Sequence, residues 1–373
     1  MVSSLTPQTS PRIVVKIGSS LLVDPAGVVR RDWLETVVDD VATRRAAGQQ
    51  VIIVSSGAIA LGARRLALPK GGRASLEDAQ AAAATGQIAL SQCWAELLDA
   101  KGMTAAQILV TLDDLEDRRR YLNAAATLER LMGLGVVPVI NENDSVATAE
   151  IRFGDNDRLA ARIAQAASAQ GVVLLSDVDG LYTADPSKDP KAERIPVVRR
   201  IDARIRGMAK AESSSGMGSG GMASKIEAAR IANAAGAALV IVSGLHNHPL
   251  ARLADTDCGT IFTGEGARPA KKAWLAGRLT SKGRIHIDAG AATALAKGAS
   301  LLPAGARSVD GKFARGDVVE VVDAEGHVVA HGLAEYDVEE AARICGKRSE
   351  LLADILGYAP RAAMVHRDHM VLL

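Results

Sequence analysis

Aromatic residues are scarce in this chain: they make up 3% of its 373 residues, although 48% of the residues are hydrophobic. The apolar content is therefore mainly Ala, Val, Leu and Ile, a composition common among compact α/β enzymes. The formal net charge is only +1, which gives no reason to expect strong non-specific binding to nucleic acids or membranes. A chain of this length can bury a large core and can form two domains.

Cysteine is also rare, and Cys93, Cys258 and Cys345 lie far apart in the sequence. An odd number of cysteines without a C-x-x-C pair predicts neither a disulfide framework nor a zinc site. No apolar run is long enough to span a bilayer, and the N-terminal segment MVSSLTPQTSPR lacks the apolar core of a signal peptide. We therefore expect a cytoplasmic protein without a membrane segment.

Short β-branched runs alternate with helical patterns up to residue 243. The runs that predict strands span 13–17, 51–56, 107–110, 136–140, 172–176 and 238–243, and the clearest helical patterns span 33–48 and 76–98. Such alternation is typical of right-handed βαβ units, which form a mainly parallel sheet covered by helices on both faces. Because ligands of such sheets bind at the carboxyl ends of the strands, the residues that follow these strands are expected to share one site.

The pattern changes near GEGARPAKKA, residues 264–273, which is typical of a linker. After it the apolar runs are shorter and turn signals are more frequent. We predict a catalytic domain over 1–265, a linker over 266–280, and a small β-rich domain over 281–373 with one or two helices, such as 338–344.

Polar residues follow the first two predicted strands. Lys16, near the end of the first strand, would be costly to desolvate without a partner, and the following Gly18 lets backbone N–H groups approach an anion. This pattern fits a phosphate site and, equally, a lysine that reaches solvent. Ser56 precedes a predicted helix, where it either caps the helix, the commoner case, or helps to bind a carboxylate or phosphate.

The loop after strand 136–140 concentrates acids and amides: Asn141, Glu142, Asn143, Asp144, Asp155, Asn156 and Asp157. Acids that are clustered in this way repel one another unless a cation or an amine lies among them. The alternative is a solvated turn in which Asp157 caps the next helix, but the position after a buried strand favours a binding site. The spacing is not that of an EF-hand, so Ca²⁺ is not expected.

Two further segments have the composition of a nucleotide site. Ser176 and Asp177 end a strand, and Asp179-Gly180 predicts a hairpin turn, so this segment either lines a nucleotide or is only a hairpin. The stretch GMGSGGMASK, residues 216–225, contains G-x-G-x-x-G, but polar residues precede it where a dinucleotide fingerprint needs a strand. It is also not a Walker A loop. It is either a linker or a glycine loop whose amides, helix end and Lys225 converge on a polyphosphate.

Together these stretches resemble, in order and spacing, the amino-acid kinase family, and within it the members that phosphorylate glutamate and carry a C-terminal PUA domain. The resemblance covers essentially the whole chain and includes VVKIGSS, IVSSGAIALG, VVPVINENDSVATAEIRFGDND, SDVDGLYTADP and SGMGSGGMASK. It implies an α/β fold, a three-layer sandwich with a mainly parallel sheet, followed by a small β-rich PUA-like domain. Departures are mild: Ser19 stands where Thr is frequent, and Ala223-Ser224 replaces Ser-Thr.

The resemblance implies that ATP phosphorylates the side-chain carboxylate of L-glutamate, with Mg²⁺, as the first step towards proline. Lys16 and Lys225 would stabilise the transferred group, and Asp157 would orient them as the third catalytic residue. Glutamate would be held by Ser56, Asp144 and Asn156, with Asn141 and Asp155 nearby. The ATP pocket would be formed by Lys16, Ser176, Asp177, Ser219, Gly220, Gly221, Met222, Ala223, Ser224 and Lys225. The resemblance leaves open which residues bind the metal, and Mg²⁺ is expected to be carried mainly by the ATP phosphates.

The resemblance further implies inhibition by proline and a homo-oligomer, either a dimer or a tetramer. PUA domains can contact RNA, but residues 276–373 contain 12 Lys and Arg against 13 Asp and Glu. This net charge of −1 argues against RNA as the main partner, because RNA binding normally needs a basic surface.

Simple chemistry agrees with a carboxylate acceptor. The glutamate side chain, with a pKa of about 4.3 in solution, is already ionised at pH 7 and needs no catalytic base. N-acetylglutamate, aspartate, carbamate and uridylate are alternative acceptors. The acid–amide loop favours a free amino acid over an acetylated one, whose nitrogen carries no charge.

Overall fold

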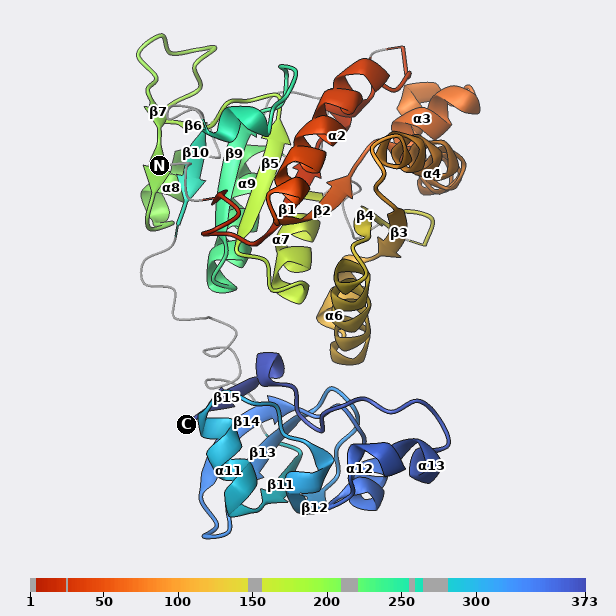
Figure 1. The fold of residues 1–373 in the computed structure, drawn as a ribbon. Helices are drawn as coiled ribbons and strands as arrows, with labels where there is room; N and C mark the ends of the chain where they lie inside the picture. The colour runs from red at the N-terminus through yellow and green to blue at the C-terminus, as the bar shows by residue number, and fades with distance from the viewer. Residues whose placement is uncertain (1–4, 25, 147–155, 209–220, 255–258, 264–280) are drawn as a thin grey trace. The chain divides into compact units, whose positions relative to one another are not determined.

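The computed structural model describes residues 5–24, 26–146, 156–208, 221–254, 259–263 and 281–373. The chain divides into two compact units, residues 1–267 and 268–373, and each unit contains its own sheet (Figure 1). Within the described residues, no helix has the length and apolar character needed to cross a bilayer.

An eight-stranded sheet in the order β3-β4-β2-β1-β5-β9-β10-β8 forms the centre of the first unit. From β3 to β9 all neighbours are parallel, whereas β10 runs antiparallel to β9, so the predicted mainly parallel sheet is confirmed. All six predicted strands are present, with ends shifted by at most two residues. The strands are β1 (Arg12–Ile17), β2 (Gln50–Ser55), β3 (Ala105–Val110), β4 (Val137–Glu142), β5 (Gly171–Ser176), β8 (Val197–Val198), β9 (Ala238–Ser243) and β10 (Thr260–Phe262).

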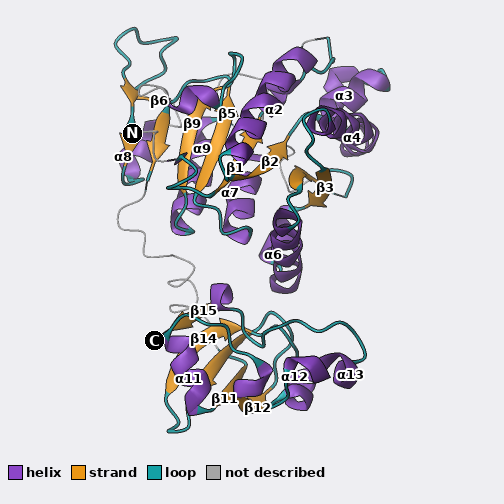
Figure 2. Ribbon diagram, viewed as in Figure 1, coloured by secondary structure: helices purple, strands orange, loops and turns teal. Residues whose placement is uncertain are grey.

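Helices cover both faces of this sheet, which makes the three layers that were predicted (Figure 2). Alternate residues of a strand enter different cores: Val14 belongs to a cluster with residues of α6, α7 and α9, and Val15 belongs to a cluster with residues of α2, α3 and α4. Burial on both faces explains why the strands are continuous apolar runs in the sequence. The helices are α2 (Arg31–Ala46), α3 (Ala58–Arg65), α4 (Leu76–Asp99), α6 (Arg118–Gly133), α7 (Asn156–Ala166) and α9 (Met222–Ala234).

Helices α3 and α4 cross in direct backbone contact. A Cβ atom placed on Gly62 would lie 1.8 Å from the carbonyl oxygen of Ala82, and one on Gly86 would lie 1.9 Å from that of Ala58. No side chain fits at either position, so the two glycines are required by the close approach. This contact fixes the middle of α4 against the segment that follows β2.

The hairpin turn predicted at Asp179-Gly180 is wrong. These residues precede β6 (Leu181–Tyr182), which pairs antiparallel with β7 (Arg194–Ile195) across the intervening residues 183–193. Gly180 is needed for a different reason: a Cβ there would lie 2.6 Å from the hydroxyl of Thr260. The remaining short elements of this unit are α1 (Ser19–Leu22), α5 (Leu112–Glu116), α8 (Ala203–Met208), η2 (Pro69–Gly72) and η3 (Ala251–Ala254).

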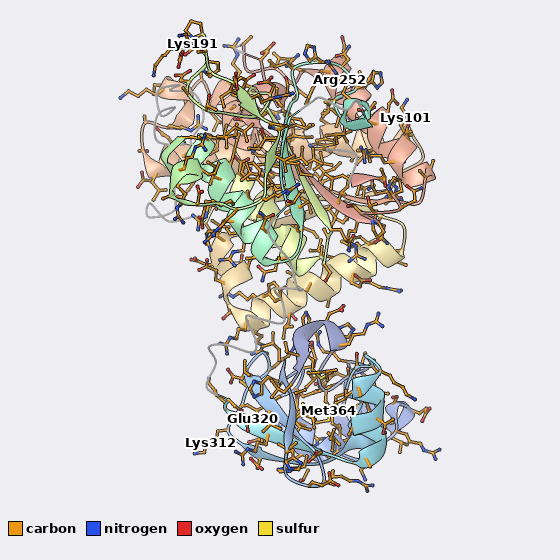
Figure 3. The ribbon with its side chains drawn as sticks, turned by 90° about the vertical axis from the view of Figure 1, so that its left-hand side faces the viewer. Lys101, Lys191, Arg252, Lys312, Glu320 and Met364 are labelled. Carbon is orange, nitrogen blue, oxygen red and sulfur yellow. The ribbon has the colours of Figure 1, made fainter. Side chains whose placement is uncertain are left out.

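The second unit is a five-stranded sheet in the order β12-β11-β13-β14-β15, packed with short helices. The predicted helix 338–344 is present as α12 (Val338–Ile344), whereas α11 (Ala289–Ala296) and α13 (Leu352–Leu356) were not predicted. Figure 3 labels Met364, which is buried in this core, and Lys312, which is exposed. The strands are β11 (Gly283–Ile287), β12 (Ala306–Gly311), β13 (Val318–Val322), β14 (Val328–Leu333) and β15 (Met370–Leu372).

Candidate active site at the carboxyl edge of the large sheet

A buried cluster of three charges lies near the carboxyl end of β1. Nζ of Lys16 lies 2.6 Å from Oδ1 of Asp157, and Nζ of Lys225 lies 2.9 Å from Oδ2 of the same carboxylate. The three side chains are only 9%, 1% and 8% exposed in the order Lys16, Asp157, Lys225. They come from β1 and from the first turns of α7 and α9, so the fold brings together the three residues expected to be catalytic.

The pKa of Asp157 shows how strongly the two lysines act on it. Burial by itself raises this pKa, but the charges and hydrogen bonds of Lys16 and Lys225 outweigh burial and lower the pKa to about 2. Asp157 is therefore ionised at neutral pH, and the cluster carries one positive charge in excess. A cluster of this kind attracts an anion and holds its two ammonium groups in fixed positions.

The neighbouring residue, Asn156, belongs to a network of amides and hydroxyls. Its Nδ2 donates to Oγ of Ser56 at 2.7 Å and to Oδ1 of Asn141 at 3.1 Å. Helix α3 begins at Ala58 with Gly57 at its N-cap in a left-handed conformation (φ 108°), and no side chain caps it. The interpretation of Ser56 as a helix cap is therefore wrong. Its hydroxyl is buried and accepts a hydrogen bond from Asn156.

Asp144 lines a small cavity of about 220 Å³. Its side chain is buried, and Oδ1 has no hydrogen-bond partner among the described residues. Burial raises the pKa of Asp144 to about 6, although the charge of Arg73 partly opposes this rise. The cavity is smaller than the usual range for drug-sized ligands, about 300–1,000 Å³, and suits a smaller metabolite. Its other lining residues are Ala58, Ala83, Ala84, Gln87, Ile88, Gln107, Leu109, Glu142, Asn143 and Ser145.

Most of the described acids and amides of this loop are not solvated. Asn141, Glu142 and Asp144 are all buried, as are Asn156 and Asp157 at the start of α7. Asp155 lies outside the described residues, as do Ser219 and Gly220. The prediction that these three residues take part in binding stays a prediction.

The expected nucleotide side lies along the same edge. Ser176 ends β5, which pairs with β1, and its hydroxyl donates to Oδ1 of Asp177 at 3.1 Å. Gly221 is the N-cap of α9, whose first turn contains Met222, Ala223 and Ser224 followed by Lys225. No acidic residue lies in that turn, so the positive end of the helix is not offset by a carboxylate of its own.

Sequence reasoning missed Gln87, which accepts a hydrogen bond from Nδ2 of Asn141 through its Oε1 at 2.8 Å and lines the cavity. Its signal is weak, because it is a single polar residue on a long alanine-rich helix. Within the described residues, no group of three or more His, Cys, Asp or Glu side chains could hold a metal ion.

Comparisons with known proteins agree with this geometry. Residues 11–243 match the Amino acid kinase family, and residues 283–356 match the PUA domain. A glutamate 5-kinase of Zymomonas mobilis subsp. mobilis is 64% identical, over 98% of this chain and 92% of that protein. The glutamate 5-kinases of Sphingopyxis alaskensis and Novosphingobium aromaticivorans are 65% and 60% identical, over 100% and 98% of this chain and 100% and 97% of their own lengths.

Proposed function

Because this chain belongs to the amino acid kinase family, we propose that it transfers the γ-phosphoryl group of ATP to the side-chain carboxylate of L-glutamate. The products are L-glutamyl 5-phosphate and ADP, in the first step of proline biosynthesis. One observation carries the proposal: Asn156 and Asp157 are consecutive, and they join the amide network to the lysine cluster. An acceptor site and a phosphate site therefore meet at the start of α7.

The lysine cluster suits the chemistry of this transfer. Glutamate supplies an ionised carboxylate as nucleophile, so the barrier is mainly the repulsion between this anion and the phosphates of ATP. Lys16 and Lys225, held 2.6 and 2.9 Å from Asp157, provide fixed positive charge where negative charge gathers. Preorganised charge of this kind, together with positioning of the two reactants, is what phosphoryl transfer requires.

The acid–amide side suits a free amino acid. Asp144 has a buried oxygen without a partner among the described residues, and the α-ammonium group of glutamate can pair with it. Ser56 accepts from Asn156 and keeps its own hydroxyl hydrogen to donate to a carboxylate. An acetylated acceptor has no such positive charge and would leave Asp144 uncompensated.

The nucleotide would lie against Ser176, Asp177 and the first turn of α9, where backbone N–H groups and Lys225 can contact its phosphates. Mg²⁺ would be carried mainly by the phosphate oxygens of ATP, an arrangement this ion commonly adopts at kinase sites. There it would add positive charge to that of the lysines.

Further features of the family extend the proposal. Proline carries an ammonium and a carboxylate group on one carbon, as glutamate does, and would compete for the site that contains Asp144. We expect a homo-oligomer, a cytoplasmic location, and a structural or regulatory C-terminal unit for which RNA is not the main partner.

The test is the release of ADP from ATP by the purified chain with and without L-glutamate. Hydroxylamine added to the reaction traps an acyl phosphate as a hydroxamate and so identifies a carboxylate acceptor. We expect glutamate to give the highest kcat/KM in a panel with N-acetylglutamate, aspartate, carbamate and uridylate, and proline to inhibit. ADP release that glutamate does not stimulate, or that another acceptor stimulates more, would contradict the proposal.

A further inference from the structure

Gln87 connects the wall of the cavity to the amide network. It lies near the middle of α4, where Gly86 holds the helix against α3, and its side chain lines the same cavity as Asp144. Its Oε1 accepts a hydrogen bond of 2.8 Å from Nδ2 of Asn141. The Gln87 side chain therefore links α4, on which it lies, to Asn141 near the end of β4.

Neighbouring groups fix which way the Gln87 amide is turned. The hydroxyl of Ser91, one turn further along α4, donates to the backbone carbonyl of Gln87 at 2.7 Å. Its hydrogen is thereby committed, so the same oxygen accepts from Nε2 of Gln87 at 3.1 Å. With its nitrogen bound to Ser91, Gln87 presents its oxygen to Asn141.

The hydrogen bonds of Asn141 and Asn156 continue this order of donors and acceptors into the site. Oδ1 of Asn141 accepts from Nδ2 of Asn156 at 3.1 Å and from the backbone N–H of Glu142 at 2.9 Å. Because Nδ2 of Asn156 donates to Asn141 and to Ser56, the remaining polar atom of this side chain is Oδ1, which is buried and has no partner among the described residues. A buried acceptor without a partner is unfavourable unless a ligand supplies a donor.

We propose that Gln87 is a positioning residue of the acceptor site. By holding the Asn141 amide, it keeps the Asn156 amide in the orientation that offers Oδ1 to an N–H donor of the substrate and Nδ2 to Ser56. The donor that fits is the ammonium group of an amino acid, so this inference rests on the proposed function. Gln87 acts on binding of the acceptor through Asn141 and has no part in binding ATP.

The test compares three variants of the full chain. Gln87→Met keeps the size and helix propensity of the side chain but removes the acceptor for Asn141. Ser91→Ala removes only the group that orients Gln87. The matched control is Gln92→Met, because Gln92 lies on the same helix but is exposed and donates a hydrogen bond to Glu96, away from the amide network. For each variant, KM is measured separately for glutamate and for ATP.

We expect Gln87→Met to raise KM for glutamate about tenfold, the effect of losing one buried hydrogen bond, with KM for ATP unchanged. Ser91→Ala should give a smaller rise, and it carries the test if Gln87→Met does not fold. Equal KM values for glutamate in Gln87→Met and Gln92→Met, or a parallel rise for glutamate and ATP, would overturn the inference. If the wild-type chain shows no glutamate-dependent ADP release, the proposed function itself has failed.

Discussion

Replacing Asp157 with Asn tests the central electrostatic argument. The change keeps the shape of the side chain but removes the charge that compensates Lys16 and Lys225. One pKa unit corresponds to about 1.4 kcal/mol, so lowering the pKa of Asp157 from 3.8 to about 2 corresponds to a stabilisation on the order of 2–3 kcal/mol at neutral pH. Breaking a buried ion pair commonly costs about 3–5 kcal/mol, because the partner charge stays buried. We therefore expect a loss of about 2–5 kcal/mol at pH 7.

Urea unfolding followed by tryptophan fluorescence measures this loss, because Trp33 and Trp94 are both buried in the first unit. The contribution of Asp157 to the free energy of unfolding depends on pH, and the sign of this dependence follows from its pKa. The pKa of Asp157 is lower in the folded chain than in the unfolded one, so its contribution is present at neutral pH and disappears as the pH falls. The difference between the wild type and Asp157→Asn should therefore shrink between about pH 5 and pH 2.

The matched control is an exposed ion pair on the same unit. Oδ1 of Asp39 lies 2.5 Å from Nζ of Lys101, which Figure 3 labels, but these side chains are 40% and 42% exposed. Solvent screens such a pair, and Asp39→Asn should cost at most about 1 kcal/mol. The argument fails if Asp157→Asn is no more destabilising than Asp39→Asn, since burial would then add nothing to the interaction.

Three other substitutions test the site and its support. Lys225→Ala should lower kcat by about 10²–10³, the usual effect of removing one preorganised donor, and near-normal turnover with both substrates saturating would contradict its role. Asp144→Asn should raise KM for glutamate but not for ATP. The same substitution should raise the urea midpoint of unfolding, because a pKa of about 6 means that the charged form of Asp144 is disfavoured in the folded chain. Gly86→Ala should cost about 1–3 kcal/mol, because its Cβ would meet the Ala58 carbonyl, whereas Gly133→Ala, with open space around it, should be neutral or stabilising in thermal unfolding.

Much of the first unit could be predicted from the sequence because local and tertiary signals agree there. Strands such as β2 (Gln50–Ser55) contain a continuous apolar run, and burial on both faces of the sheet is the reason. Short elements such as β8 (Val197–Val198) have no comparable signal, because two residues show no period. The hairpin was misplaced because Asp179-Gly180 has turn chemistry, whereas Gly180 is present to make room for Thr260.

The candidate site was predictable to the extent that charge at a strand end is unusual. Lys16 in an apolar strand needs a partner of opposite charge, and this partner is Asp157, which is buried at the start of α7. The network around Ser56 was not predictable, because a serine before a helix normally acts as a cap. Its real partner, Asn156, lies 100 residues further along the chain. Gln87 could not be found either, since its role depends on how closely α4 approaches α3.

Asp144 and Asp157 are both buried, but the groups that surround them differ, and this difference indicates where the positive charge of a ligand would be favoured. Asp157 has two ammonium partners inside the chain, and its pKa falls to about 2. For Asp144, burial outweighs the opposing charge of Arg73, and the pKa rises to about 6. A buried carboxylate without a partner destabilises the fold, and a bound cation removes that penalty. We therefore propose that phosphates bind at the lysine cluster, which has an excess positive charge, and that an ammonium group binds at Asp144.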